Sequence, residues 1–316
     1  MKIGSLFAGI GGIELGFEKA GFECAWGIEI DKKACQTYKA NHKHTIINAD
    51  ISKVDLSALS PIDILTAGFP CQAFSVAGYQ KGFSDERGNI FFEILRYLRY
   101  FEPQIIFLEN VKHLTTHDKG KTFTRIKIEL ENLGYKLKFE VLNTCKYGNI
   151  PQNRERIYIV GFLNSDLYEN FVFPRQIKLT KQVQNLIDDS APDEFYYHKT
   201  KYYDELKSVM KNKNTLYQWR RHYVRENKSN LCPTLTANMG TGGHNVPLVM
   251  DSKDIRKLTP RECARFQGFD DDFILPKELS NATLYKQIGN SVSISVIESI
   301  AKEIKKVVEN EYRAVC

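Results

Sequence analysis

Cys71 is a single thiol that follows a short apolar segment. Residues 62–66 have the pattern of a buried strand, and the run Ala67-Gly68-Phe69-Pro70-Cys71-Gln72 places the thiol on the loop that comes next. Open α/β sheets carry out their chemistry at such strand ends. Pro70 fixes its own backbone angle and favours an extended residue before it, so the approach to the thiol is stiff. A thiol held there and ionised is a nucleophile, whereas most free cysteines are buried core residues.

A carboxyl group and two guanidinium groups follow at the ends of later strands. Glu109 ends a predicted strand at 105–108, and parallel strands would bring it to the same rim as Cys71. A thiol and a carboxyl group together could act on one planar base. Arg154 and Arg156 alternate in the run Gln152-Asn153-Arg154-Glu155-Arg156, where they could hold a phosphate or polarise a carbonyl. An arginine beside a glutamate is also often a solvated pair.

A glycine-rich turn, Phe7-Ala8-Gly9-Ile10-Gly11-Gly12, lies between the first predicted strand and helix. Glu14 stands where a dinucleotide motif has its third glycine, which speaks against a hydride-transfer site. Glu29 ends the second strand and could accept the hydroxyls of a ribose, and Asp50 ends the third and could accept from an adenine amino group. Each could also be an exposed loop acid, but three such features at consecutive strand ends predict an adenosyl pocket.

Apolar periodicity predicts an α/β fold around a doubly wound, mainly parallel sheet. The expected strands lie at 3–7, 22–30, 44–48, 62–66, 105–108, 137–142 and 157–162, and the expected helices at 13–20, after Asp31, at 90–100, 123–133 and 291–308. Asp31 is the expected cap of its helix. Residues 166–250 lose this periodicity. We therefore expect a catalytic and cofactor-binding domain at 1–175, a smaller, loop-rich recognition domain at 176–260, and a hinge and closing helix at 261–316.

Composition narrows the setting of the protein. The 316 residues carry a net charge of +6, which permits a polyanionic partner only through a local basic surface. The seven cysteines form no Cys-x-x-Cys pair, which argues against a zinc ligand set and a disulfide framework, so we expect no metal and a reducing, cytoplasmic location. The chain has no run of about 18 apolar residues, which predicts no membrane contact.

Basic and aromatic side chains alternate in the middle of the chain, in the run Tyr217-Gln218-Trp219-Arg220-Arg221-His222-Tyr223-Val224-Arg225. Arg220, Arg221 and Arg225 could read guanine edges in a major groove, and Lys211 and Lys213 could contact phosphates. A solvated basic face is the alternative. The loop at 234–245 adds glycines that let backbone groups approach base edges closely.

Six ordered runs now match a family. They resemble the motif series of DNA (cytosine-5)-methyltransferases of bacterial restriction-modification systems, and the resemblance covers nearly the whole chain except about 165–230. The runs are Phe7-Ala8-Gly9-Ile10-Gly11-Gly12, Gly68-Phe69-Pro70-Cys71-Gln72, Glu109-Asn110-Val111, Gln152-Asn153-Arg154-Glu155-Arg156, Arg261-Glu262-Cys263-Ala264-Arg265-Phe266-Gln267-Gly268-Phe269 and Gln287-Ile288-Gly289-Asn290-Ser291-Val292.

The resemblance implies a reaction in which Cys71 adds to carbon 6 of a flipped-out cytosine, so that carbon 5 can take a methyl group from S-adenosylmethionine. Glu109 would hydrogen-bond or protonate ring nitrogen 3, and Arg156 would orient the base carbonyl and support Glu109, with Arg154 in the same motif. The implied donor contacts are Phe7, Ala8, Gly9, Ile10, Gly11, Glu29, Ile30, Asp50, Ile51, Pro70, Ile90, Asn290 and Val292. The implied DNA contacts are Gln72, Ser75, Arg87, Arg220, Arg221, Arg225, Thr234, Leu235, Gly242 and His244, and residues 75–87 would form a lid.

The resemblance also implies the partners. These are double-stranded DNA and a restriction endonuclease that shares the site without a stable complex, and we expect a monomer. The recognition region is similar to those that read GC-rich palindromes with outer CC and GG pairs. Two other functions stay open: a tRNA cytosine-5 methyltransferase on the same scaffold, and a catalytically silent DNA-binding protein, against which the intact Cys71, Glu109 and Arg156 speak.

Overall fold

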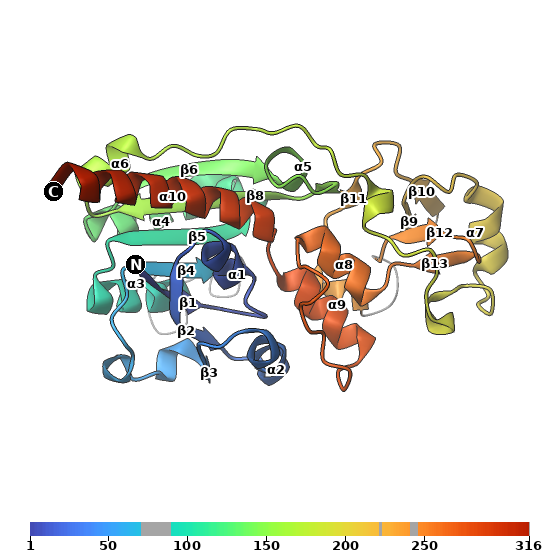
Figure 1. Ribbon diagram of the computed structural model, residues 1–316, viewed down its shortest axis with the longest axis horizontal. Coiled ribbons are helices and arrows are strands. Elements are labelled where there is room, and N and C mark those ends of the chain that lie inside the picture. Colours follow the sequence, from blue (N-terminus) through green and yellow to red (C-terminus); the bar gives the residue numbers. More distant parts are fainter. Residues whose placement is uncertain (71–89, 221–222, 241–245, 316) are drawn as a thin grey trace. The chain divides into compact units, whose positions relative to one another are not determined.

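The chain forms two compact units in the computed structural model, which describes residues 1–70, 90–220, 223–240 and 246–315 (Figure 1). Unit 1 comprises Met1–Leu142, Glu155–Arg175 and Val296–Cys316. Unit 2 comprises Asn143–Arg154 and Gln176–Ser295. Unit 2 therefore takes in most of the expected hinge segment as well as a short stretch before β8 (Glu155–Phe162).

Unit 1 is built on a seven-stranded sheet with the order β3-β2-β1-β4-β5-β8-β6. Four neighbouring pairs, β1–β2, β2–β3, β1–β4 and β4–β5, are parallel, whereas β5–β8 is antiparallel. The other strands are β1 (Lys2–Leu6), β2 (Glu23–Glu29), β3 (Thr45–Asn48), β4 (Ile64–Gly68), β5 (Ile105–Val111) and β6 (Lys136–Asn143). The sheet is mixed and mainly parallel, which confirms the α/β prediction at this level.

Helices pack on both faces of this sheet because successive side chains of a strand point to opposite faces. On β5, Ile106 and Leu108 join a core with α3 (Ile90–Phe101) and α4 (Lys121–Asn132). Phe107 between them packs edge-on against Phe17 of α1 (Gly12–Lys19), with ring centroids 5.2 Å apart. The remaining helices of this unit are α2 (Lys32–Asn41) and α6 (Ser165–Asn170), and the long helix α10 (Ile294–Val315) runs into it from unit 2.

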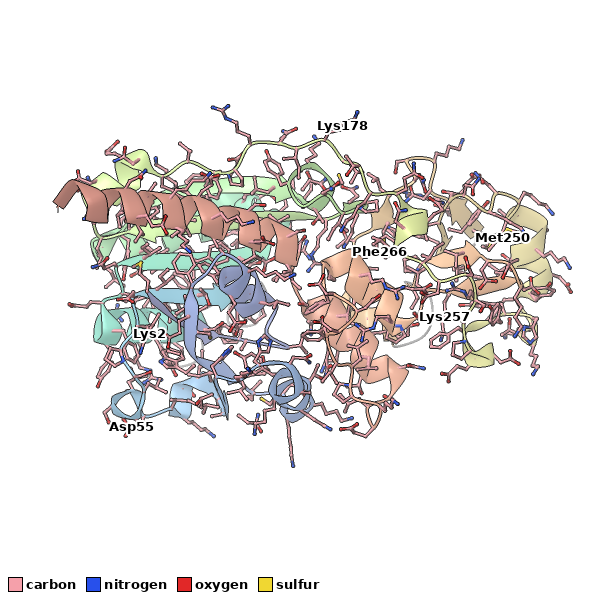
Figure 2. The ribbon with its side chains drawn as sticks, in the orientation of Figure 1. Lys2, Asp55, Lys178, Met250, Lys257 and Phe266 are labelled. Carbon is pink, nitrogen blue, oxygen red and sulfur yellow. The ribbon has the colours of Figure 1, made fainter. Side chains whose placement is uncertain are left out.

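A glycine lets α10 approach α1 closely. A Cβ atom on Gly16 of α1 would lie 2.6 Å from the Cβ of Ile297 on α10, too close for any side chain. A hydrogen bond ties the start of β1 to the residue before β4: the backbone N–H of Lys2, labelled in Figure 2, donates to Asp63 Oδ2 at 2.6 Å. Asp31 caps α2 as predicted, because its Oδ1 accepts from the backbone N–H groups of Lys33 and Ala34.

Unit 2 contains a four-stranded antiparallel sheet, so the expected loop-rich region has a regular core. Its order is β10-β9-β12-β13, and the strands are β9 (Tyr217–Arg220), β10 (Tyr223–Glu226), β12 (Leu248–Met250) and β13 (Ile255–Lys257). A two-stranded parallel pair joins β7 (Gln152–Asn153) to β11 (Cys232–Pro233). The helices are α5 (Thr144–Tyr147), α7 (Tyr203–Val209), α8 (Pro260–Gln267) and α9 (Asn281–Asn290).

A fully buried arginine joins this sheet to α8. The guanidinium of Arg256 pairs with Asp251 and with both carboxylate oxygens of Glu262. Burial raises the pKa of the Asp251 carboxyl, but hydrogen bonds from the backbone of Asp254, the Tyr196 hydroxyl and Arg256 outweigh it and hold this pKa below its ordinary value. The buried charges are therefore paired, as a buried arginine requires.

Short 3-10 helices lie at Ile51–Lys53, Leu56–Ala58, Lys112–Thr115, His117–Gly120, Val183–Asn185, Asp193–Phe195 and Ala237–Gly240. Within the described ranges, none of the helices has the length and apolar character needed to cross a membrane.

Candidate active site

The glycine-rich turn after β1 leaves open space beside the backbone. Phe7, Gly9 and Gly11 have positive φ angles of 57°, 57° and 88°. A Cβ atom on Gly9 would meet only the carbonyl oxygen of Phe7, at 4.0 Å, so a ligand can approach the backbone there. A Cβ atom on Gly11 would instead lie 1.9 Å from Nε2 of His42. The first glycine therefore fits a cradle, and the second makes room for a histidine.

Glu29 ties this turn to the end of the neighbouring strand β2. Its Oε2 accepts from the backbone N–H of Gly9 at 2.9 Å, and its Oε1 accepts from the backbone N–H of Asp31 at 2.8 Å. Each carboxylate oxygen can accept more than one hydrogen bond, so Glu29 can still receive ribose hydroxyls. Ile30 follows with 68% of its surface exposed, which offers an apolar side chain for a flat ring.

Asp50 follows β3, the next strand of the sheet. Its Oδ1 accepts from the backbone N–H of Ser52 at 3.0 Å and from the Ser52 hydroxyl at 2.8 Å, and these hydrogen bonds lower the pKa of Asp50. Ile51 is buried, and its carbonyl accepts from the Tyr97 hydroxyl at 2.9 Å. The glycine turn, Glu29 and Asp50 therefore do lie at consecutive strand ends of β1, β2 and β3.

Glu109 and Arg156 form an enclosed charged pair at this rim. Arg156 pairs with Val111 across β5–β8, so its side chain shares a face with Glu109 two residues away. Arg156 Nε lies 3.1 Å from Glu109 Oε1, and the two side chains expose only 12% and 10% of their surface. Across β4–β5, Glu109 pairs with Gly68, where a Cβ atom would lie 3.7 Å from Glu109 Oε2. The strand that leads to Cys71 therefore ends directly beside this carboxyl group.

Asn110, which motif reading did not single out, holds the approach to Cys71. Its Nδ2 donates to the carbonyl of Phe69 at 2.8 Å, and Asn110 is only 3% exposed.

The strand β5 runs on through Val111, so Glu109 does not end it as predicted. The antiparallel pairing with β8 extends the strand by continuing the hydrogen-bond ladder to Arg156. Pro70 and Ile90 are described, whereas Cys71, Gln72, Ser75, Arg87 and the expected lid at 75–87 lie outside the described residues.

Arg154 and Arg156 do not alternate on one strand face, because Arg154 lies between β7 and β8. Arg154 is 2% exposed, and its guanidinium donates to the carbonyl of Leu235 at 2.8 Å and to the carbonyl of Ser291 at 2.5 Å. Leu235 also donates its N–H to Gln152 Oε1 at 3.3 Å. Arg154 therefore holds two backbone segments in place, a role that only the fold reveals.

Ser291 lies between two of the expected donor contacts at the end of α9. Asn290 is exposed and Val292 is buried. Gly289 packs so tightly that a Cβ atom on it would lie 2.2 Å from the carbonyl carbon of Thr236. Arg154 and Gly289 thus fix the 234–237 segment to the end of α9 inside unit 2.

The expected DNA contacts are only partly within the described chain. Arg225 is exposed on β10, Thr234 Oγ1 donates to the carbonyl of Asn153 at 2.7 Å, and Leu235 is 1% exposed. Arg220 belongs to β9. Arg221, Gly242 and His244, together with the Arg220 side chain, lie outside the described parts.

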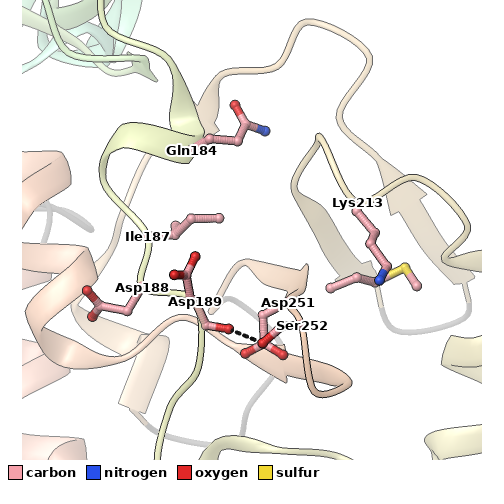
Figure 3. Close-up of a pocket in the computed structure, with 8 residues that line it drawn as sticks. Gln184, Ile187, Asp188, Asp189, Lys213, Asp251 and Ser252 are labelled. Atoms are coloured by element: carbon pink, nitrogen blue, oxygen red, sulfur yellow. Dashed lines mark hydrogen bonds between the residues drawn. The ribbon is translucent and has the colours of Figure 1, made fainter.

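A pocket of about 220 Å³ in unit 2 is lined by Lys213 and by acidic residues (Figure 3). Two of the acids have partners: Asp251 pairs with Arg256, and Asp188 pairs with Arg265 at 2.7 Å. The carbonyl of Asp189 accepts from the Ser252 hydroxyl at 2.7 Å, as Figure 3 shows. Because its lining is acidic, this pocket does not suit a phosphate backbone.

Comparison with known proteins decides the family. The family model of C-5 cytosine-specific DNA methylase matches residues 1–306. The chain belongs to this family. It is 55% identical to "Type II methyltransferase M.Bsp6I" of Bacillus sp. (strain RFL6), over 97% of this chain and 99% of that protein. It is 43% identical to "Type II methyltransferase M.NlaX" of Neisseria lactamica, over 96% of each chain. The resemblance read from the motifs is confirmed.

Solved structures support the fold of this family member. The S. pombe Dnmt2 methyltransferase superposes with a TM-score of 0.74 at 20% identity, over 98% of this chain and 99% of that chain. A putative DNA modification methyltransferase from an E. coli prophage gives 0.70 at 20% identity, over 98% and 99%. At this identity the likeness concerns the fold alone.

Proposed function

We propose that this DNA (cytosine-5)-methyltransferase modifies a flipped-out cytosine in a short, specific duplex site, with Cys71 as the nucleophile. The observation that carries the assignment is the enclosed Glu109–Arg156 pair beside Gly68, because the strand that ends there leads through Pro70 into Cys71. A carboxyl group, a guanidinium and a thiol are the groups that activation of a cytosine ring requires.

The residues divide the reaction among them. Carbon 5 of cytosine is too electron-poor to attack a methyl donor, so the Cys71 thiolate first bonds to carbon 6. Charge then builds on ring nitrogen 3, where Glu109 donates a hydrogen bond or a proton. Arg156 holds Glu109 through its Nε at 3.1 Å and orients the base carbonyl. After methyl transfer, we propose that a water takes the carbon 5 proton. The electron pair of that bond re-forms the carbon 5–carbon 6 double bond, the thiolate leaves carbon 6, and any proton on nitrogen 3 returns to Glu109.

The described residues fit S-adenosylmethionine, which supplies the methyl group. Gly9 leaves open space beside its backbone, Glu29 offers its carboxylate to a ribose, and Ile30 exposes an apolar side chain. Asp50 keeps acceptor capacity for an adenine amino group after its two bonds to Ser52. The remaining proposed donor contacts are Phe7, Ala8, Ile10, Gly11, Ile51, Pro70, Ile90, Asn290 and Val292.

Base flipping and site reading fall to loops and to unit 2. Extrusion of the cytosine costs a few kcal/mol of stacking and pairing. The proposed DNA contacts are Gln72, Ser75, Arg87, Arg220, Arg221, Arg225, Thr234, Gly242 and His244. Leu235 is not among them, because it is buried and its backbone N–H and carbonyl are both bonded within unit 2. The names of the similar proteins, type II methyltransferases, support a protective role beside a restriction endonuclease. We further propose that the enzyme acts in the cytoplasm as a monomer.

The test is covalent capture. Wild-type protein is mixed with cofactor and a duplex that carries 5-fluorocytosine at the target, where the fluorine cannot leave as a proton does. We expect an adduct on a denaturing gel with wild type and none with Cys71→Ser. Cys145→Ser, at a partly exposed cysteine, is the control and should still form the adduct. Absence of any adduct with wild type would overturn the mechanism. Methyl transfer to tRNA and not to plasmid DNA would instead favour the tRNA alternative.

A further inference from the structure

Glu18, His42 and His44 converge at a place that the methyl-transfer mechanism does not use. Glu18 lies near the end of α1, His42 follows the last residue of α2, and His44 precedes β3. Glu18 Oε2 lies 3.6 Å from His42 Nδ1, and Glu18 Oε1 lies 3.1 Å from His44 Nδ1. The two histidine side chains expose only 2% and 9% of their surface, and Glu18 exposes 34%. The cluster is enclosed but keeps one route to solvent.

The outer ring nitrogens of both histidines are held by neighbours. His42 Nε2 lies 3.3 Å from the carbonyl oxygen of Ile10, which can only accept, so this nitrogen carries a proton. His44 Nε2 contacts the hydroxyl of Tyr38, which in turn donates to Glu14 Oε1 at 3.4 Å. With the Tyr38 proton directed to Glu14, the Tyr38 oxygen is the acceptor for His44 Nε2. In the neutral form of each imidazole, the lone pair of Nδ1 then faces the carboxylate of Glu18.

The Nδ1 lone pairs of the two histidines and the Glu18 carboxylate repel one another unless a positive charge lies between them. Two extra protons would put two imidazolium rings side by side, with ring centroids 5.1 Å apart, in a largely buried place. One divalent cation satisfies all three groups at once. In a tetrahedral site with bonds of about 2.0–2.1 Å, ligand atoms lie about 3.3–3.5 Å apart. One Glu18 oxygen lies 3.1 Å from His44 Nδ1 and the other lies 3.6 Å from His42 Nδ1, both close to this value. One ligand atom from each of the three residues lies within 4.8 Å of the other two.

We propose that Glu18, His42 and His44 form a binding site for a divalent transition-metal ion such as Zn²⁺. Imidazole and carboxylate ligands suit zinc. Metal-binding histidines usually donate their other N–H to a carbonyl or a similar acceptor, as Ile10 and Tyr38 provide here. Water completes the coordination from the solvent side of Glu18.

The site joins two parts of the chain that lie beside the cofactor turn. Its ligands link α1 to the segment between α2 and β3. The His42 ring contacts the carbonyl of Ile10 and occupies the space that a side chain on Gly11 would fill. A bound ion therefore holds the turn in place and is structural, because its ligands take no part in the proposed chemistry. Cysteine spacing pointed away from zinc, whereas the two histidines of the run His42-Lys43-His44, separated by one residue, are the sequence signal for this site.

The test measures Zn²⁺ binding to the full-length protein without a histidine tag, after removal of metals with a chelator. Equilibrium dialysis should show one tightly bound Zn²⁺ per wild-type chain. Glu18→Gln and His44→Gln should each lower the affinity for Zn²⁺ by at least about 100-fold, because losing a ligand costs more than losing a residue that only hydrogen-bonds a ligand. Tyr38→Phe, which keeps all three ligands, should weaken binding by about 10–100-fold. Zn²⁺ should raise the melting temperature of wild type and not that of Glu18→Gln.

Two controls separate this site from other metal binding. The matched control replaces both His113 and His117 by glutamine. These two histidines have ring centroids 6.1 Å apart and hydrogen-bond threonine hydroxyls. This double variant should bind Zn²⁺ like wild type. Co²⁺ bound to wild type should show visible absorption of tetrahedral nitrogen and oxygen ligands without a thiolate charge-transfer band, which excludes cysteines. Equal Zn²⁺ binding by wild type and Glu18→Gln, or no binding to wild type, would overturn the proposal. The cluster would then be an ion pair between Glu18 and protonated histidine. Because these readouts do not involve methylation, they are independent of the proposed function.

Discussion

Replacement of Glu109 by glutamine separates the chemistry from the binding of the methyl donor. Glutamine keeps the shape of the side chain, but it cannot pass a proton to the ring, and it carries no negative charge to pair with Arg156 Nε, which lies 3.1 Å from Glu109 Oε1. General acid catalysis contributes about 10²–10⁴ in rate, or about 3–5 kcal/mol of barrier. The groups proposed to hold the donor are elsewhere: Glu29 bonds the backbone of Gly9 and Asp31. We therefore expect methyl transfer to fall by this factor while donor affinity changes little.

The assay combines single-turnover methylation of a cognate duplex with calorimetric titration of the donor. The matched control is Glu155→Gln, whose side chain is 43% exposed and pairs with Lys112 at 3.0 Å. Exposed pairs contribute only about 0–1 kcal/mol, so this variant should keep a rate close to that of wild type. A Glu109→Gln rate within about tenfold of wild type would refute the acid assignment. An unchanged rate with weakened donor binding would move Glu109 into the donor site.

Three further predictions test the arrangement of unit 2. Arg154→Ala should lower the urea midpoint of unfolding, because each buried carbonyl that loses its donor costs about 1–3 kcal/mol, and an unchanged midpoint would contradict the positioning role. The pKa of Asp251 is lowered in the folded chain. Its ionised carboxylate therefore stabilises the fold above the unfolded pKa of about 3.9, and this stabilisation is lost as the pH falls through the lower, folded pKa. In urea titrations from pH 7 downward, the free energy of unfolding of Asp251→Asn should fall less steeply with pH than that of wild type. Replacing Lys211 and Lys213 together by alanine should weaken binding to all duplexes and flatten its salt dependence. Alanine at Arg220, Arg221 and Arg225 in turn should cost about 1–3 kcal/mol on the cognate duplex only for at least one of the three, and an unchanged cognate-to-scrambled ratio for all three would direct the search to the loop at 234–245.

The sequence by itself was enough to predict a mainly parallel sheet and to place several polar residues at its strand ends. Alternating apolar strands and amphipathic helices predict a mainly parallel sheet, and parallel strands end at one edge. This is why Glu29 and Asp50 could be assigned to neighbouring strand ends before the strand order was known. The ordered motifs around Cys71, Glu109 and Arg156 were equally readable, because each is a local run of residues with a demanding chemistry.

Only the tertiary structure decided which side chains meet across long separations in the sequence. Arg154 and Arg156 look equivalent as a pattern, but one donates to Leu235 and Ser291 and the other pairs with Glu109. The cluster of Glu18 with the two nearby histidines, and the buried charges around Arg256, are likewise set by how helices and strands pack. Local propensity acts over a few residues, whereas these contacts depend on which elements become neighbours in the folded chain, and that is decided by burial of the whole core.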